Sequence, residues 1–208
     1  MARPRAADHE DKRQAMLDRA AELFAAHGYD RTSTAMIAEA CRVSKALLYH
    51  YYKDKSELLF DVLAQHLQHL LELVRHAANE NVPPRERLEN IAVALIEAYR
   101  HADAVHQVQI NCLAVLPAER QENLRTLERA IVGEVALVIE DLSPEVQRDR
   151  RLLKPVTMSF FAMLNWHYLW HREGAGLSRF DYARLAAGLV AEGLPAAAAA
   201  LREDAAAG

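Results

Sequence analysis

Residues that cross-link or break regular structure are scarce in this chain of 208 residues, which has 2 cysteines, 7 glycines and 7 prolines. Cys41 and Cys112 cannot form a disulfide framework, and such sparse usage is typical of a reducing cytosol. The chain also lacks sustained alternation of apolar and polar residues and any Asn-Gly or Asp-Gly pair, which argues against strands and hairpins. We therefore expect an all-α protein located in the cytoplasm.

Membrane and catalytic signals are missing as well. No uninterrupted apolar run approaches the roughly 18 residues that span a bilayer, and the segment 1–13 has no apolar core of a secretory signal. The chain contains no phosphate-binding loop, no Gly-x-Ser-x-Gly and no His-Glu-x-x-His. We expect no membrane association, no enzymatic activity, no metal and no cofactor.

Apolar residues instead recur every three to four positions, which predicts helices through most of the chain. Gly28 suits the left-handed position after a helix, Pro117 a helix start, and Gly174 a break between helices. The expected helices, about nine in number, cover residues 9–27, 35–41, 45–51, 55–79, 84–101, 105–115, 118–141, 151–173 and 178–192. An alanine-rich tail that frays should follow them.

Two of these helices are short and adjacent. The hydroxyl groups of Thr32, Ser33 and Ser44 are suited to cap their N-termini, and only a few residues separate the two helices. Such a pair is a helix-turn-helix. In its second helix Leu48 and Tyr52 are four residues apart, so they share one side and predict the buried face.

The remaining sides of that second helix carry Lys45, Ala46, Tyr49 and His50. These groups can reach phosphates and base edges in a major groove, where the small Ala46 permits close approach. The segment 31–55 has five basic and two acidic residues, although the whole chain has a net charge of −4. Charge alone does not separate a phosphate-binding patch from an ordinary solvated surface, and neither does any of these residues taken singly. Their combination at this spacing favours DNA binding.

Three segments between Arg13 and Leu59 carry a resemblance to known proteins. They read A-A-E-L-F, T-S-T-A-M-I-A-E-A and V-S-K-A-L-L-Y-H-Y-Y-K-D-K-S-E-L-L, and the region is about a quarter of the chain. It resembles the tetracycline-repressor-like (TetR) family of bacterial transcription regulators. The resemblance implies a three-helix DNA-binding head at 1–55 and a helical ligand-binding and dimerisation body at 56–208. Such a protein binds a near-palindromic DNA operator as a homodimer and is released by a small-molecule effector.

The resemblance also assigns roles by matched position. The residues implied to touch the DNA backbone are Thr32, Ser33, Ser44, Lys45, Tyr49, Tyr51 and Lys55, and those nearest to base edges are Ala46, Leu47 and His50. A cation in the first turn of a helix opposes the helix dipole, and a phosphate partner would explain Lys55. Leu47 replaces a common Thr or Ser, and Arg42 replaces a glycine in the turn. Either Arg42 bears left-handed strain of about 1–2 kcal/mol, or the turn differs from that of the family.

The densest aromatic cluster lies within residues 157–172. On a single helix, Phe160, Met163, Trp166, His167 and Trp170 would share one side and line an apolar effector pocket, although a subunit interface or plain core would give the same pattern. His167 and Asn165 would be the polar groups of this pocket, and weaker pocket candidates are Tyr99, His106, Asn111 and Cys112. The L-N-W-x-x-x-W pattern is similar to one in family members that respond to acyl-coenzyme A thioesters, so a fatty acid or acyl thioester is our hypothesis for the effector.

The family pairs its last two long helices with those of a second subunit, so Phe180, Leu185 and Leu189 are the expected dimer contacts. Three alternatives stay open at this point. The first is a protein-interaction module without DNA binding, and the second is a helical enzyme. The third is a metal site at His167, His171 and Glu173, or at His66 and His69, which only the spacing suggests. Cys112 is either an inert core residue or a redox sensor.

Overall fold

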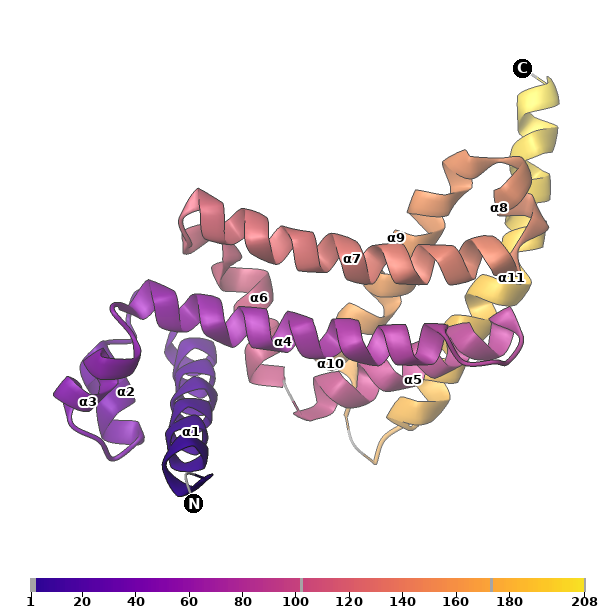
Figure 1. Cartoon of the computed structure of the whole chain (residues 1–208). Helices are drawn as coiled ribbons and strands as arrows, with labels where there is room; N and C mark the ends of the chain where they lie inside the picture. The colour runs from indigo at the N-terminus through magenta and orange to yellow at the C-terminus, as the bar shows by residue number, and fades with distance from the viewer. Residues whose placement is uncertain (1–2, 102, 173, 208) are drawn as a thin grey trace. The chain divides into compact units, whose positions relative to one another are not determined.

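The computed structural model describes residues 3–101, 103–172 and 174–207, and the side chains of 9–100, 104–109, 112–172 and 174–203. Over these residues the chain is helical (Figure 1). The one β-type contact among them is an isolated bridge between Arg172 and Ala175. The helices are α1 (Arg3–His27), α2 (Thr34–Ala40), α3 (Lys45–Tyr51), α4 (Lys55–Ala78), α5 (Pro84–His101), α6 (Asp103–Cys112), η1 (Leu113–Val115), α7 (Ala118–Leu142), α8 (Pro144–Arg148), η2 (Arg150–Leu152), α9 (Leu153–Asn165), α10 (His167–Trp170) and α11 (Arg179–Ala207). The all-α prediction is confirmed.

The chain forms two compact units. The first comprises Met1–Gln68 and Ala102–Leu127, and the second comprises His69–His101 and Glu128–Gly208. Helices α4 and α7 each contribute residues to both units. The boundary between the two packed units therefore does not coincide with residue 55, where the sequence places the end of the DNA-binding head.

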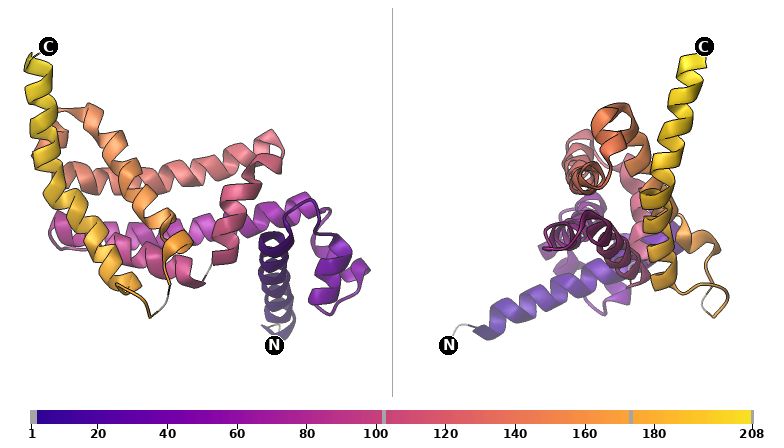
Figure 2. Two further views of the ribbon diagram at one scale, coloured as in Figure 1. Left: turned by 180° about the vertical axis from the view of Figure 1, so that it is seen from behind. Right: turned by 90° about the vertical axis from the view of Figure 1, so that its right-hand side faces the viewer.

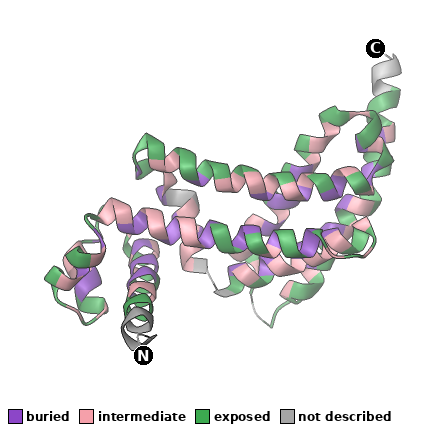
Figure 3. Ribbon diagram, viewed as in Figure 1, coloured by how far each residue is buried: buried purple, intermediate pink, exposed green. Residues whose placement is uncertain are grey.

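The first unit is built around α1. One stripe of this helix, which includes Met16, Leu17 and Phe24, is buried, and the opposite stripe is exposed (Figure 3). Helices α2 and α6 contact α1, and α3 contacts α2. Each large apolar side chain buried in this way stabilises the fold by roughly 1.5–3 kcal/mol before entropy is considered.

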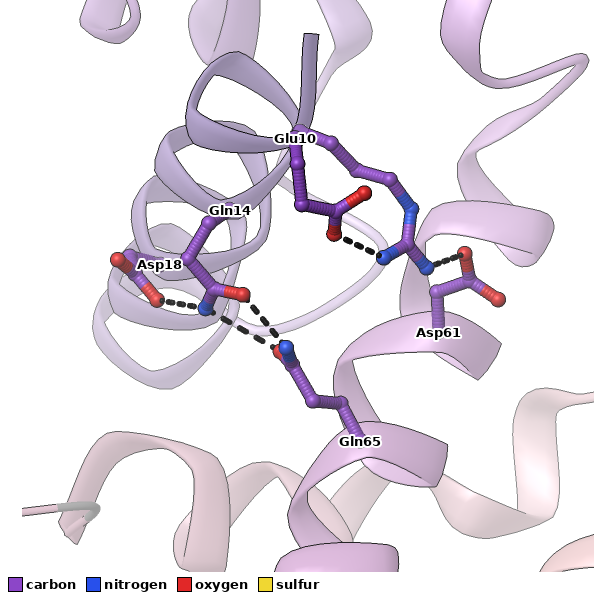
Figure 4. A network of polar contacts seen from close by, with 6 residues as sticks. Glu10, Gln14, Asp18, Asp61 and Gln65 are labelled. Atoms are coloured by element: carbon purple, nitrogen blue, oxygen red, sulfur yellow. Dashed lines mark hydrogen bonds and ion pairs between the residues drawn. The ribbon is translucent and has the colours of Figure 1, made fainter. Parts of the chain in front are cut away.

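Polar contacts tie α1 to the beginning of α4 (Figure 4). The Arg13 guanidinium donates hydrogen bonds to Asp61 Oδ2 at 2.7 Å and to Glu10 Oε1 at 3.1 Å. Gln14 and Gln65 exchange amide hydrogen bonds across the same pair of helices. Because Arg13 and Asp61 are only partly exposed, this ion pair is screened less than a surface pair and fixes the angle between the two helices.

In the second unit α11 packs on α5 and α9, and Figure 2 shows α9 and α11 side by side. The buried side of α11 consists of small and apolar residues, among them Ala183, Ala187 and Val190. The Tyr99 hydroxyl donates to Asn165 Oδ1 at 2.8 Å and the Tyr182 hydroxyl to the Met163 carbonyl at 2.9 Å. Burial raises the pKa of Tyr99 well above its ordinary value, so its hydroxyl stays a donor.

Helix α11 has the length and composition of a membrane-spanning helix, with a mean hydropathy of 1.3 over the qualifying window. The prediction that the chain has no membrane-spanning segment was based on uninterrupted apolar runs. Arg184 and Glu192 interrupt the apolar stretch of α11. Packing on α5 and α9 buries 28% of this window, so contacts within the unit account for only part of its apolar composition.

Three predicted boundaries were wrong, and the first is the start of the helix expected at 9–27, which begins at Arg3. The single helix expected at 151–173 ends at Asn165, and Trp166, with φ −94° and ψ 0°, separates it from α10. The five aromatic and apolar residues expected on one side of a single helix therefore do not share a side. Phe160 and His167 are buried, whereas Trp166 and Trp170 are 49% and 57% exposed. The tail expected to fray after residue 192 continues as helix to Ala207, past Pro195, because Leu194 and Ala198 are buried.

His167 is buried at the centre of an aromatic cluster. Its ring stacks on His171 at 4.3 Å and on Tyr182 at 4.5 Å, and the edge of Trp170 lies 4.9 Å away. Its Nε2 has no hydrogen-bond partner among the described residues. Burial, together with the nearby His171 and Arg179, lowers the pKa of His167 from 6.5 to about 4. The ring is therefore neutral at pH 7 in the folded protein.

This shift predicts a pH-dependent part of the stability. Between pH 6.5 and 4 the unfolded chain binds a proton at His167 and the folded chain does not, so stability falls as the pH falls through this range. We expect a loss of about 2 kcal/mol between pH 7 and pH 4.5 that His167→Phe removes. Urea unfolding of both proteins at the two pH values measures it. An equal pH dependence in the variant would show that His167 is not the titrating group.

Candidate nucleic-acid interface

Serine caps start both helices of the helix-turn-helix. Ser33 Oγ accepts a hydrogen bond from the Met36 N–H at 3.2 Å, and Ser44 Oγ accepts one from the Leu47 N–H at 3.1 Å. Both serines are exposed, and a hydroxyl that accepts one bond can still donate its proton. Ser33 and Ser44 can therefore cap their helices and donate to a phosphate at once.

The turn between α2 and α3 is a Schellman motif with arginine at the position that glycine usually occupies. The Val43 N–H donates to the Ala38 carbonyl and the Arg42 N–H donates to the Glu39 carbonyl, both at 2.9 Å. Arg42 has φ 56°, the left-handed conformation of the first alternative, which costs about 1–2 kcal/mol for a residue with a Cβ. Its side chain is exposed.

Helix α3 has one buried and one exposed side. Leu48 and Tyr52 are buried, as the spacing predicts. Lys45, Ala46 and His50 are exposed, and Tyr49 is 52% exposed. Leu47 and Tyr51 are half-buried between these sides. The predicted groove-facing residues thus lie together on a solvent-facing surface.

Thr34 belongs to this surface, although sequence reasoning did not select it. The Thr34 and Tyr49 hydroxyls are 3.1 Å apart, so a hydrogen bond joins the first turn of α2 to the exposed side of α3. The T-S-T run at 32–34 offers three hydroxyl groups as DNA contacts, and the resemblance assigned this role to the first two and not to the third.

Thr32 is not placed to contact DNA, which corrects one of the assignments. The residue is buried, and its Oγ1 lies 2.8 Å from the Gly28 carbonyl and 3.1 Å from the Leu23 carbonyl. Its hydroxyl proton is therefore used inside the chain, where it closes the turn between α1 and α2.

Lys55 also has partners within the chain. Its ammonium donates to the Tyr29 carbonyl at 2.6 Å and the Thr32 carbonyl at 2.9 Å, and it lies 4.0 Å from the centre of the Tyr29 ring. A phosphate is thus not needed to explain a cation in the first turn of α4. The same turn has a compensating cap, since Asp54 Oδ1 accepts a hydrogen bond from the Glu57 N–H at 2.7 Å.

The structure brings only some of the predicted effector residues together, because Tyr99 donates to Asn165 and the edge of Trp170 lies against His167. Tyr99, Phe160, Met163, Trp166, His167 and Trp170 belong to the second unit, whereas His106 belongs to the first. The Asn111 side chain lies outside the described residues. Trp170 lines a cavity of about 270 Å³ together with Tyr182 and Leu185. His106 is buried beside His66, their ring centres 6.4 Å apart.

The suggested metal and redox sites gain no support. No three potential metal-ligating side chains come together among the residues that the structure describes, and Glu173 lies outside them. Cys112 is buried, and burial raises the pKa of its thiol. Because the thiolate is the reactive form, this shift disfavours oxidation.

Two capped helices joined by a tight turn, with a polar exposed side on the second helix, define a helix-turn-helix DNA-binding protein. Family models agree. Residues 16–62 match the bacterial regulatory proteins of the tetR family, and residues 81–194 match the tetracyclin repressor-like C-terminal domain. The chain belongs to the TetR family of transcription regulators, which are not enzymes.

Solved structures show the same fold over nearly the whole chain. A TetR-family transcriptional regulator from Bordetella parapertussis 12822 is 34% identical, with a TM-score of 0.78 over 86% of this chain and 93% of its own. AibR, solved in complex with isovaleryl coenzyme A and operator DNA, is 24% identical, with a TM-score of 0.73 over 86% of this chain and 97% of its own.

A curated relative matches over a shorter region. The transcriptional repressor KstR2 of Mycobacterium tuberculosis is 29% identical over 51% of this chain and 54% of its own length. The chain thus matches about half the length of this relative, so the relative's regulatory role does not transfer directly.

Proposed function

We propose that the protein is a cytoplasmic repressor that binds a near-palindromic operator as a homodimer and leaves it when a small, largely apolar effector binds. The observation that carries the proposal is the exposed side of α3, where Lys45, Ala46, Tyr49 and His50 face solvent. A recognition helix must offer such groups to the major groove while its other side is held by the core, as Leu48 and Tyr52 hold it here.

Operator binding tests this proposal directly. Selection of bound sequences from a random DNA pool, followed by fluorescence anisotropy, should yield a near-palindromic site. Lys45→Ala should weaken binding to all sequences about equally and lower the salt dependence, because it removes a phosphate contact. His50→Ala should also relax base preference, by about 1–3 kcal/mol at the position it reads. A wild-type protein that binds no DNA would favour the interaction-module alternative.

The dimer contact is proposed on the side of α11 opposite its buried residues. Leu185 and Leu189 are 44% and 56% exposed, and four residues separate them, so they share that side. Phe180 is exposed too, but its position nine residues before Leu189 puts it nearly opposite on the helix. Leu185 and Leu189 support the proposed contact, and Phe180 does not join them.

A double substitution tests the dimer. Leu185→Glu with Leu189→Glu should convert dimer to monomer at micromolar concentration in native mass spectrometry, because four carboxylates would meet in an apolar contact. Leu137→Glu is the matched control, since Leu137 is 60% exposed on α7 in the same unit. A wild-type protein that is monomeric at this concentration would contradict the proposed homodimer.

For the effector we propose a fatty acid or acyl thioester. The L-N-W-x-x-x-W pattern supports this class, and so does the isovaleryl coenzyme A bound in AibR. An effector that favours one state of the body weakens DNA binding by a coupling of roughly 1–3 kcal/mol. Thermal-shift assays with isovaleryl coenzyme A and longer acyl thioesters should raise the melting temperature, and no shift with any of them would remove this class.

A further inference from the structure

The segment that joins α10 to α11 borders the cavity of about 270 Å³ described above, which we call the α10–α11 cavity. Most of its wall is apolar or aromatic and consists of Trp170, Leu177, Tyr182 and Leu185. The Trp170 and Tyr182 rings meet edge to face, with centres 5.0 Å apart. A concave apolar wall with a few polar groups is typical of a site for a small molecule.

Contacts within the second unit hold this wall in place. The Tyr182 hydroxyl donates to the Met163 carbonyl at 2.9 Å, and the Tyr182 ring stacks on the buried His167 ring at 4.5 Å. In the connecting segment the Ala175 N–H donates to the Arg172 carbonyl at 3.1 Å. The cavity is therefore formed before any ligand arrives, and a ligand that enters it has little ordering of the protein to offset.

The polar part of the lining is basic. It comes from His171 and Arg172, and the described lining residues include no acid. Arg172 is exposed and has no side-chain hydrogen bond or ion pair with the described residues. Asp181, in the first turn of α11, already accepts a hydrogen bond from the Ser178 hydroxyl at 2.6 Å. A guanidinium without a partner beside an apolar wall is suited to bind a carboxylate through two parallel hydrogen bonds.

The volume of the cavity limits the size of its ligand. A cavity of about 150 Å³ holds benzene, whereas drug-sized ligands occupy pockets of about 300–1,000 Å³. The 270 Å³ found here therefore fits one ring or one short branched chain together with a carboxylate. A coenzyme A thioester is far larger and does not enter as a whole.

We propose that the α10–α11 cavity binds a small carboxylic acid, with the carboxylate on Arg172 and the apolar body against the Trp170 and Tyr182 rings. The proposal rests on the proposed effector response and deepens it, because it assigns the apolar acid a place in the body. Leu185 belongs both to the cavity wall and to the proposed dimer contact. A bound acid therefore touches the side of α11 that meets the partner subunit, which links binding to the arrangement of the two DNA-binding heads.

Isothermal titration calorimetry with phenylacetate and isovalerate tests the carboxylate contact. Both acids should bind the wild type, and Arg172→Ala should raise their Kd roughly 10- to 100-fold, because charge-assisted hydrogen bonds are lost. Phenylacetamide, the neutral counterpart of phenylacetate, should bind the wild type and Arg172→Ala equally. Arg148→Ala is the matched control, since Arg148 is an exposed arginine of the same unit and lies outside the cavity lining.

The apolar wall has its own test. Leu177→Trp should fill the cavity and raise the Kd of phenylacetate and of phenylacetamide alike, by about 10-fold or more. Leu137→Trp makes the same exchange at an exposed leucine of α7 in the same unit and should change neither Kd. Circular dichroism should be unchanged in all variants.

Two results would overturn this inference. One is a wild-type protein that binds neither acid at millimolar concentration, and the other is an Arg172→Ala variant that binds both as tightly as the wild type does. A rise in melting temperature with acyl thioesters would in that case still support the proposed effector class at another place.

Fluorescence anisotropy with operator DNA tests the link to regulation separately. Phenylacetate or isovalerate should raise the operator Kd of the wild type and leave that of Arg172→Ala unchanged. Binding of the acids at this cavity without any change in the operator Kd would support the site and overturn its role as the effector site.

Discussion

Ala46→Glu is expected to abolish operator binding without unfolding the protein. Ala46 is exposed on α3, between Lys45 and the two aromatic residues of the groove-facing side. A glutamate there would fill the space that close approach to the bases requires, and its carboxylate would face the phosphates. We expect the Kd to rise at least about 100-fold, or about 3 kcal/mol, in fluorescence anisotropy at fixed salt.

A matched exchange separates this effect from a general effect of charge. Ala118→Glu makes the same substitution at an exposed residue in the first turn of α7 and should leave the Kd within about twofold. Ala46→Ser, which adds one small polar group, should bind DNA with at most a modest loss. Operator binding by Ala46→Glu at wild-type strength would mean that α3 does not enter the groove.

Lys55→Ala should destabilise the first unit rather than act mainly on DNA binding. The substitution removes two charge-assisted hydrogen bonds to the Tyr29 and Thr32 carbonyls and a cation–π contact. A cation at the N-terminus of a helix is unfavourable, so its removal from α4 offsets a few tenths of a kcal/mol of the lost stability. The net loss in free energy of unfolding should be about 2 kcal/mol, measured by urea unfolding.

Lys53→Ala is the control for this prediction, because Lys53 is an exposed lysine two residues earlier in the chain. It should change the free energy of unfolding by less than about 0.5 kcal/mol. If Lys55→Ala unfolds like the wild type but shows a lower salt dependence of DNA binding, the original assignment of Lys55 to a phosphate would be correct.

The parts of the fold that local chemistry controls could be predicted from the sequence. Ser33 and Ser44 cap their helices, Gly28 takes φ 80° after α1, and Arg42 takes the left-handed conformation, one of the two alternatives for its turn. Each of these depends on residues within one or two turns of chain. The exposed side of α3 followed from spacing alone for the same reason.

Features that depend on distant partners could not be predicted. The bonds from Lys55 reach carbonyl groups more than twenty residues away, and nothing in the local sequence indicates them. The interruption at Trp166 and the continuation of α11 through Pro195 depend on which residues tertiary packing buries, and this overrides local propensity. The prediction of an effector pocket from the aromatic spacing in 157–172 depended on one straight helix. Because the helix is interrupted, the residues inferred from that spacing do not lie on one side of it.

The shared helices α4 and α7 set a limit on how small an autonomously folding fragment can be. A fragment cut after residue 55 would lack Leu58, Leu59 and Leu63, which are fully buried, and Asp61, the partner of Arg13. It would also lack 102–127, which complete the first unit. Deletion mapping that treats the first 55 residues as a portable module should therefore yield an expanded, protease-sensitive polypeptide, and grafting this head onto another scaffold requires the transfer of both shared helices.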